Sequence, residues 1–223
     1  RSLRSFVQSM PEWLGEKIQV KNVIKKKLKY SGNIYFVPHH LSHASAAYYT
    51  SLYTSSAILT IDGVGEYQTT ALWSANESKI TLLKEMEYPN SLGLLYSTFT
   101  AFCGFQVNDG EYKLMGLAAY GKQKYIQDIY KIVDVRPDGS FRTDMKYFSY
   151  GYGEKMFSHK FEELVGSPRK PEGRITERHK DIAASIQAVT EEIYFKMVNH
   201  LASLTSSKSL CIGGGVALNS LAN

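Results

Sequence analysis

Residues 37–44 read Val-Pro-His-His-Leu-Ser-His-Ala, and residues 58–66 read Ile-Leu-Thr-Ile-Asp-Gly-Val-Gly-Glu. In the first stretch, Pro38 suits the first turn of a helix, and apolar residues follow it at helical spacing. His39 and His43 are four residues apart, so a helix places both imidazoles on one face. We therefore expect a helix that presents two possible metal ligands on the same side.

The second stretch adds a carboxylate. Residues 56–61 form a short apolar run with β-branched members, followed by a glycine turn, which predicts a buried strand. Asp62 then lies beyond the carboxyl end of a strand, where α/β sheets usually keep their chemistry. Together, His39, His43 and Asp62 suit a divalent iron, zinc or manganese ion, with a position left for water or substrate.

Two other interpretations of the histidines deserve comparison. The metalloprotease motif His-Glu-x-x-His needs a glutamate at its second place, where this chain has His40, so that interpretation fails. The second is that His39 and His43 only cap or pack a helix. The residues by themselves leave this alternative open.

Composition limits the class of protein. The chain has 223 residues, of which 43% are hydrophobic and 21% charged, which indicates a globular protein of one large or two small domains. No apolar run approaches the roughly 18 residues that cross a bilayer, so we expect a soluble protein with no membrane partner. Cys103 and Cys211 are too few for a disulfide framework, and a cytoplasmic location is expected.

The net charge of +5 is concentrated in one segment. Five lysines lie within residues 21–29, and Val20, Ile24 and Leu28 recur every four residues through them. This pattern predicts an amphipathic helix with a solvated lysine face. We do not interpret it as a nucleic-acid site, because no aromatic or glycine-rich recognition motif accompanies it.

Residues 1–30 are predicted to be helical, with a second helix opening at Pro11. Residues 34–37, Ile-Tyr-Phe-Val, predict a buried strand that would form a strand-helix-strand crossover with residues 56–61. Further patterns predict a hairpin of residues 69–73 with 80–84 and a buried helix over residues 91–105 that begins at Ser91. They also predict an amphipathic helix over residues 125–133 and a long core-facing helix over residues 181–204.

Two glycine-containing segments suggest a ligand pocket. In residues 108–121 a polar turn leads into a helix in which Gly116 would permit close packing, and Glu111 and Lys113 either face a pocket or form an exposed charged pair. Near residue 213 a strand, three glycines and a predicted helix from residue 216 follow one another. Free N–H groups and a helix dipole make that a seat for a nucleotide, and a tight packing turn is the alternative.

Five segments follow one another in a fixed order. They are His-His-Leu-Ser-His-Ala (39–44), Ile-Asp-Gly-Val-Gly-Glu (61–66), Ser-Leu-Gly-Leu-Leu-Tyr (91–96), Gly-Glu-Tyr-Lys-Leu-Met-Gly-Leu-Ala-Ala-Tyr-Gly (110–121) and Gly-Gly-Val-Ala-Leu-Asn (214–219). These motifs resemble the NodU/CmcH carbamoyltransferase family, which includes nodulation proteins and antibiotic O-carbamoyltransferases.

The resemblance implies an α/β fold of the actin-like, sugar-kinase-like ATPase (ribonuclease H-like) type, incomplete in this chain. Residues 33–223 would be part of the catalytic domain, after a helical segment at residues 1–32. It also implies that carbamoyl phosphate and ATP give a carbamoyl adenylate, whose carbamoyl group passes to a hydroxyl of a sugar or antibiotic. A homo-oligomer is compatible with this assignment.

Individual roles follow from the same resemblance. His39, His43 and Asp62 would bind the metal. The residues that would border the adenosine are Gly110, Glu111, Gly214, Gly215 and Asn219. The group that deprotonates the acceptor hydroxyl is not apparent from the sequence.

The chain also departs from the family. Ala119 stands where a proline is often found, and an upstream strand, a further aspartate ligand and an activating domain are expected outside residues 1–223. We therefore expect an internal fragment with little or no transferase activity. The alternatives are a non-catalytic nucleotide-binding or interaction module and a tRNA-modifying relative of the same fold. The three metal-ligating side chains favour a carbamoyltransferase over the module.

Overall fold

A four-stranded mixed sheet forms the centre of the computed structural model, which describes residues 6–7, 10–11, 13–151 and 155–223. Its strands are β1 (Ser55–Gly65), β2 (Gln68–Asn76), β3 (Lys79–Glu87) and β6 (Leu210–Gly213). Their order is β3-β2-β1-β6, in which β1 pairs antiparallel with β2 and parallel with β6. The protein is thus α/β, and the predicted hairpin is confirmed as β2 and β3.

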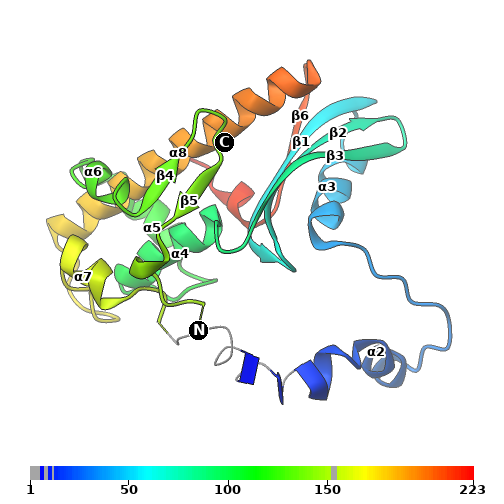
Figure 1. Ribbon diagram of the computed structural model, residues 1–223, viewed down its shortest axis with the longest axis horizontal. Coiled ribbons are helices and arrows are strands. Elements are labelled where there is room, and N and C mark those ends of the chain that lie inside the picture. Colours follow the sequence, from blue (N-terminus) through cyan, green and yellow to red (C-terminus); the bar gives the residue numbers. More distant parts are fainter. Residues whose placement is uncertain (1–5, 8–9, 12, 152–154) are drawn as a thin grey trace.

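Helices cover both faces of this sheet (Figure 1). On one face α3 (His39–Tyr49) packs against alternate residues of β1 and β2, and Ile58 and Trp73 belong to that small cluster. On the other face α4 (Leu92–Phe102) and α8 (Glu177–Thr205) pack against Leu59 and Ile61 in the larger core. Successive side chains of a strand point to opposite faces, so β1 supplies both cores.

The buried helix and the long helix are confirmed. Ser91 caps α4, because its hydroxyl accepts a hydrogen bond from the Leu94 amide at 3.0 Å. After α4, Gly104 adopts a φ of +71°, the left-handed conformation that glycine allows at a helix end. The long helix α8 begins four residues earlier than predicted, where Thr176 and His179 form a capping box.

The remaining elements lie beside α4 and α8, away from the central sheet (Figure 1). They are α5 (Glu111–Ala118), α6 (Ile126–Ile129), β4 (Val133–Val135), β5 (Phe141–Thr143), a 3-10 turn (Met145–Tyr147) and α7 (His159–Val165). The helix predicted for residues 125–133 is therefore wrong beyond its first turn. Val133 is buried and starts a strand that pairs with β5, so tertiary pairing overrides the helical pattern there.

The strand predicted at residues 34–37 is also wrong. These residues form no strand among the described residues, and Tyr35, Phe36 and Val37 are exposed by 82, 63 and 56%. β-Propensity reflects packing on a sheet, and no described strand lies beside this segment. Consequently the predicted strand-helix-strand crossover through α3 is not formed.

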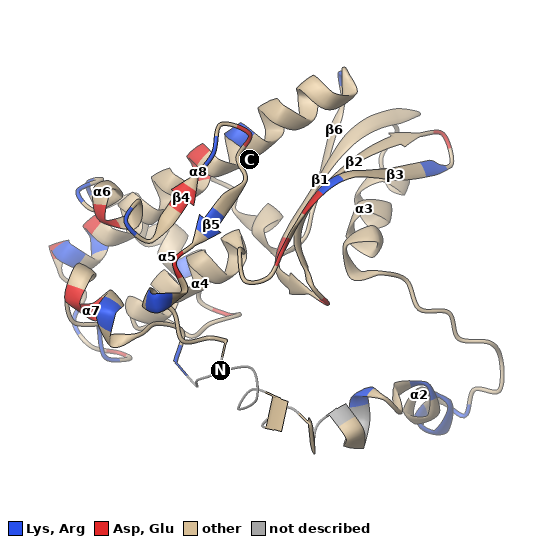
Figure 2. Cartoon of the chain, viewed as in Figure 1, with Lys and Arg blue, Asp and Glu red and all other residues tan. Residues whose placement is uncertain are grey.

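The N-terminal segment stands apart from the sheet. A π-helical stretch (Trp13–Lys17) and α2 (Val20–Leu28) are joined to α3 by an extended connection (Figure 1). The lysines line α2, as Figure 2 shows, but Val20 and Leu28 on its apolar side are exposed as well, and none of its residues is buried. The helical prediction for residues 1–5, 8–9 and 12 falls outside the described residues. No helix in the described part of the chain is long and apolar enough to cross a membrane.

Candidate metal centre and adjoining pocket

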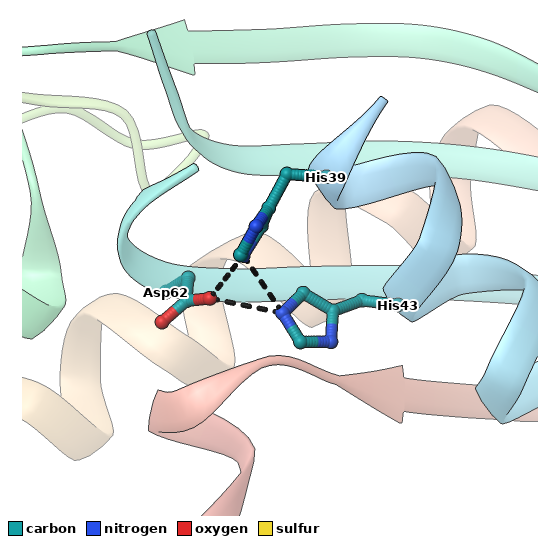
Figure 3. A group of neighbouring side chains, drawn as sticks. All are labelled: His39, His43 and Asp62. Carbon is teal, nitrogen blue, oxygen red and sulfur yellow. Dashed lines mark hydrogen bonds and ion pairs between the residues drawn. The ribbon is translucent and has the colours of Figure 1, made fainter. Parts of the chain in front are cut away.

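The structure brings His39, His43 and Asp62 together (Figure 3). Both imidazole Nε2 atoms face the Asp62 Oδ2 atom, at 2.8 Å from His39 and 2.9 Å from His43. The two Nε2 atoms are 3.0 Å apart. Ligand atoms held about 2.0–2.2 Å from one ion lie about 3 Å from one another, so these three atoms have a suitable spacing and chemistry to hold a divalent cation.

Local sequence explains how the histidines reach this point. Pro38 lies at the N-cap of α3, and the helix starts at His39. One turn later His43 projects from the same face. Gly65 lies at the end of β1 beside this turn, and a Cβ atom at that position would overlap the His39 ring. A glycine is therefore required for the His39 ring to occupy this position.

Asp62 is held by backbone amides on its other oxygen. Its Oδ1 atom accepts hydrogen bonds from the N–H groups of Gly63 at 2.7 Å and Gly215 at 3.4 Å, which leaves Oδ2 directed at the imidazoles. Burial acts to raise the pKa of this carboxyl. The hydrogen bonds from His39, from the Gly63 amide and from His43 outweigh burial, so the pKa lies below its usual value. Asp62 is thus an ionised, oriented carboxylate.

The triple glycine 213–215 packs against the end of β1. Gly214 has a φ of +94° and lies so close to the Ile61 carbonyl that a Cβ atom would overlap it. The α-helix predicted from residue 216 is wrong in the described chain, because residues Gly215–Leu218 form a 3-10 turn. Asn219 ends this turn: its backbone N–H donates to the Val216 carbonyl oxygen at 3.0 Å, and its own backbone is extended. The dipole of a full helix is therefore not available to a phosphate here.

A pocket of about 370 Å³ opens beside the Asp62 carboxylate. Its walls come from the end of β1, from α4, from α5 and the turn before it, and from the 3-10 turn Gly215–Leu218 with Asn219 after it. The lining residues are Asp62, Gly63, Gly93, Tyr96, Ser97, Asn108, Asp109, Glu111, Tyr112, Met115, Gly215, Val216, Leu218 and Asn219. Of the residues predicted to border a nucleotide, Glu111, Gly215 and Asn219 lie in this wall, whereas Gly110 and Gly214 do not line the pocket.

Glu111 is the acidic residue of the predicted pair that faces the pocket. Its Oε1 atom accepts hydrogen bonds from the Ser97 hydroxyl at 2.6 Å and from the backbone N–H of Asn108 at 3.1 Å. Lys113 does not line the pocket, and its ammonium lies 5.8 Å from the centre of the Tyr112 ring. The prediction that both residues face a pocket is therefore correct for Glu111 and wrong for Lys113, which is exposed.

Asn219 takes part in a buried network at the base of the pocket. It exchanges two hydrogen bonds of 3.0 Å with the Gln187 amide on α8, and the Tyr96 hydroxyl donates to Gln187 Oε1 at 2.9 Å. Burial raises the pKa of Tyr96. Sequence reasoning missed Tyr96, which lines the pocket, and Gln187, which bonds both Tyr96 and Asn219, because nothing local indicates that residues so far apart in the sequence meet.

Comparison with known proteins gives the family of the chain. The family model described as "Carbamoyltransferase N-terminus" matches residues 1–223, so the chain belongs to that family. It is 46% identical over its whole length to an uncharacterized protein of Synechocystis sp., of which it covers 38%. It is 34% identical to the nodulation protein NolNO of Sinorhizobium fredii, over 85% of this chain and 26% of that protein. It is 29% identical to the nodulation protein NolO of Bradyrhizobium diazoefficiens, over 83% of this chain and 32% of that protein. The chain thus spans between about a quarter and two fifths of these relatives.

Proposed function

We propose that this chain is the part of an O-carbamoyltransferase that holds a divalent cation beside a nucleotide pocket. The whole enzyme would transfer a carbamoyl group, through a carbamoyl adenylate, to a hydroxyl of a sugar or antibiotic. The observation that carries this proposal is the convergence of His39, His43 and Asp62 at the edge of the pocket, in a chain of the carbamoyltransferase family. The mixed sheet with helices on both faces is compatible with the proposed actin-like fold.

His39, His43 and Asp62 would hold iron, zinc or manganese. When bound, the ion would supply a Lewis acid that polarises the carbamoyl carbonyl or orients the adenylate. The described residues offer three ligands from one side, which is the ligand number of an open site and not of a closed structural one. Since Asp62 also lines the pocket, the open side would face the bound substrate.

The pocket itself would hold the adenosine part of ATP and of the carbamoyl adenylate. Glu111, Gly215 and Asn219 contribute to its wall, and Tyr96 and Tyr112 supply aromatic surface. The Asn219 amide is already paired with Gln187, so its role would be to fix the wall and not to bind the ligand directly. Carbamoyl phosphate and the acceptor would enter next to Asp62.

Metal content of the purified chain tests the first step of this proposal. The wild-type chain, dialysed against Fe²⁺, Zn²⁺ or Mn²⁺, should retain about one ion, and His43→Ala should retain far less. His159→Ala is a matched control, because His159 is an exposed histidine on α7 that pairs with Glu163 and lies outside the candidate metal centre. Equal metal content in the wild type and His43→Ala would refute the metal site.

A second experiment tests the activity. A longer protein that contains this chain should transfer a labelled carbamoyl group from carbamoyl phosphate to a hydroxyl acceptor when ATP is present, and Asp62→Asn should abolish the transfer. We expect little or no transfer by residues 1–223 alone. Full activity of the isolated chain would contradict that part of the proposal.

A further inference from the structure

His40 lies between the two candidate ligands in sequence but points the other way. Its side chain is completely buried. The Nδ1 atom lies 2.8 Å from the Thr60 Oγ1 atom on β1, and Nε2 lies 3.1 Å from the Gln68 carbonyl oxygen on β2. A carbonyl only accepts hydrogen bonds, so Nε2 carries the proton, and Nδ1 accepts from the Thr60 hydroxyl.

Thr60 is the centre of this network. It is completely buried and stands two residues before Asp62 on β1. Its Oγ1 atom accepts a hydrogen bond from the Trp73 indole N–H at 3.0 Å. The Ala71 carbonyl competes for the Thr60 proton, but at 3.3 Å it is farther away than His40 Nδ1. The hydrogen bonds therefore run from Trp73 through Thr60 to His40, and from His40 to Gln68.

We infer that His40, together with Thr60 and Trp73, is a positioning residue that sets the first turn of α3 against β1 and so brings the metal ligands together. This inference rests on the metal site proposed above. His39 and His43 belong to α3 and Asp62 to β1, so their mutual distances depend on how these two elements are placed. Directional bonds at His40 fix that placement in both position and rotation.

A purely hydrophobic side chain at position 40 would not fix the placement of α3 on β1 in the same way. Phenylalanine at position 40 could fill a similar volume without the cost of burying a polar ring. It would also leave the Thr60 hydroxyl and the Gln68 carbonyl without their imidazole partner. A ligand set requires placement within about 0.5 Å, which packing alone specifies less well than a satisfied hydrogen-bond network does.

Four variants test the inference in the full chain. His40→Phe and Thr60→Val each remove the bond between His40 and Thr60, whereas Thr60→Ser keeps the hydroxyl. Tyr48→Phe is the matched control, because Tyr48 is also buried on α3 and its hydroxyl bonds the Thr54 and Glu77 carbonyls near the C-terminal end of that helix. The measurements are the dissociation constant for Co²⁺, the visible spectrum of the bound Co²⁺ and the melting temperature.

His40→Phe and Thr60→Val should weaken Co²⁺ binding by about 10- to 100-fold, the usual effect of losing a group that orients a ligand, and should alter the spectrum. Thr60→Ser should restore both. Tyr48→Phe should lower the melting temperature and leave binding unchanged. Wild-type affinity and spectrum in Thr60→Val would overturn the positioning role. An equal loss of affinity in Tyr48→Phe would also overturn it, since any weakening of α3 would then suffice. Equal binding by the wild type and His43→Ala would instead refute the metal site itself.

Discussion

Gly65 and Gly63 are both close to the candidate ligands. Of these two glycines, Gly65 is the one whose missing side chain makes room for the His39 ring. A Cβ atom at Gly65 would overlap the His39 ring, whereas a Cβ atom at Gly63 would have nothing within 4 Å. Gly65→Ala should therefore displace His39 and weaken Zn²⁺ binding by about 10-fold or more. Gly63→Ala, which adds the same methyl group, should bind Zn²⁺ nearly as the wild type does. Isothermal titration of both variants would measure the difference, and equal affinities would argue against the steric role of Gly65.

The sequence predicts the convergence of the three candidate ligands better than it predicts the pocket wall. Helical spacing is local and places His39 and His43 on one face. Asp62 is predicted from the end of the apolar run 56–61, although the strand itself continues to Gly65. The pocket wall depends on which helices meet in space, so nothing in the sequence indicates Tyr96 as a neighbour of Asn219. The distances between the three ligand atoms likewise require the packing of α3 on β1.

Helix α5 contains a glycine, Gly116, in its interior. The sequence suggests that Gly116 permits close helix packing, but Gly116 is exposed and a Cβ atom there would have nothing within 4 Å. A glycine inside a helix costs roughly 0.5–1 kcal/mol relative to alanine. Gly116→Ala should therefore raise the free energy of unfolding by about that amount, measured by urea denaturation. A destabilised variant would show that Gly116 has a packing role after all.

Helix α8 is tied to residues 121–124 through Asp181, whose side chain is 7% exposed. Asp181 accepts a hydrogen bond from the Lys122 amide at 2.8 Å and forms an ion pair with the Lys124 ammonium at 2.7 Å. The Lys124 ammonium holds the pKa of the Asp181 carboxyl below its usual value, against the effect of burial, and the Lys122 amide contributes in the same direction. Because the folded state has the lower pKa, this stabilisation is present above the unfolded-state value of about 3.9 and is lost as pH falls through the folded-state value.

Asp181→Asn should consequently be less stable than the wild type at pH 7. The difference in free energy of unfolding should shrink as pH is lowered below about 4. Lys124→Met should reproduce part of the effect, since it removes the ion pair and keeps the Lys122 hydrogen bond. Chemical denaturation between pH 7 and pH 3 measures these differences. If the difference in free energy of unfolding between the wild type and Asp181→Asn stayed constant with pH, the proposed origin of the lowered pKa would be wrong.

Elements predicted from long periodic patterns, such as α4 and α8, are found in the structure, and short apolar runs are less reliable. Residues 34–37 and residues 56–61 are both short apolar runs, yet only the second becomes a strand. Residues 56–61 have β2 and β6 as partners, whereas residues 34–37 have no described partner. Strand formation is a property of the pair, so a single segment cannot show it.

At the scale of the whole molecule, the candidate site lies between two separate cores. The side of the sheet that carries α3 has a small cluster around Ala44 and Tyr48, and the other side has the larger core around α4 and α8. The pocket is on the larger side, since its lining residues include Tyr96 of α4 and Met115 of α5, which belong to or pack against the larger core. Asp62 at the end of β1 is therefore the one candidate ligand that takes part in both the metal centre and the pocket wall.

A single ion held by His39, His43 and Asp62 would join α3 to β1 and should stabilise the whole fold. An ion that binds only the folded state adds about 2.7 kcal/mol when its free concentration is 100 times the dissociation constant. For a protein of this size about 1 kcal/mol shifts the melting temperature by about 2–4 °C, so a rise of about 5–10 °C is expected. Scanning calorimetry with increasing Zn²⁺ should show this rise in the wild type and in His159→Ala, and should show none in His43→Ala. A rise of the same size in His43→Ala would mean that the stabilising ion binds elsewhere. If Zn²⁺ did not change the melting temperature of the wild type, the prediction that an ion at this site stabilises the fold would be wrong.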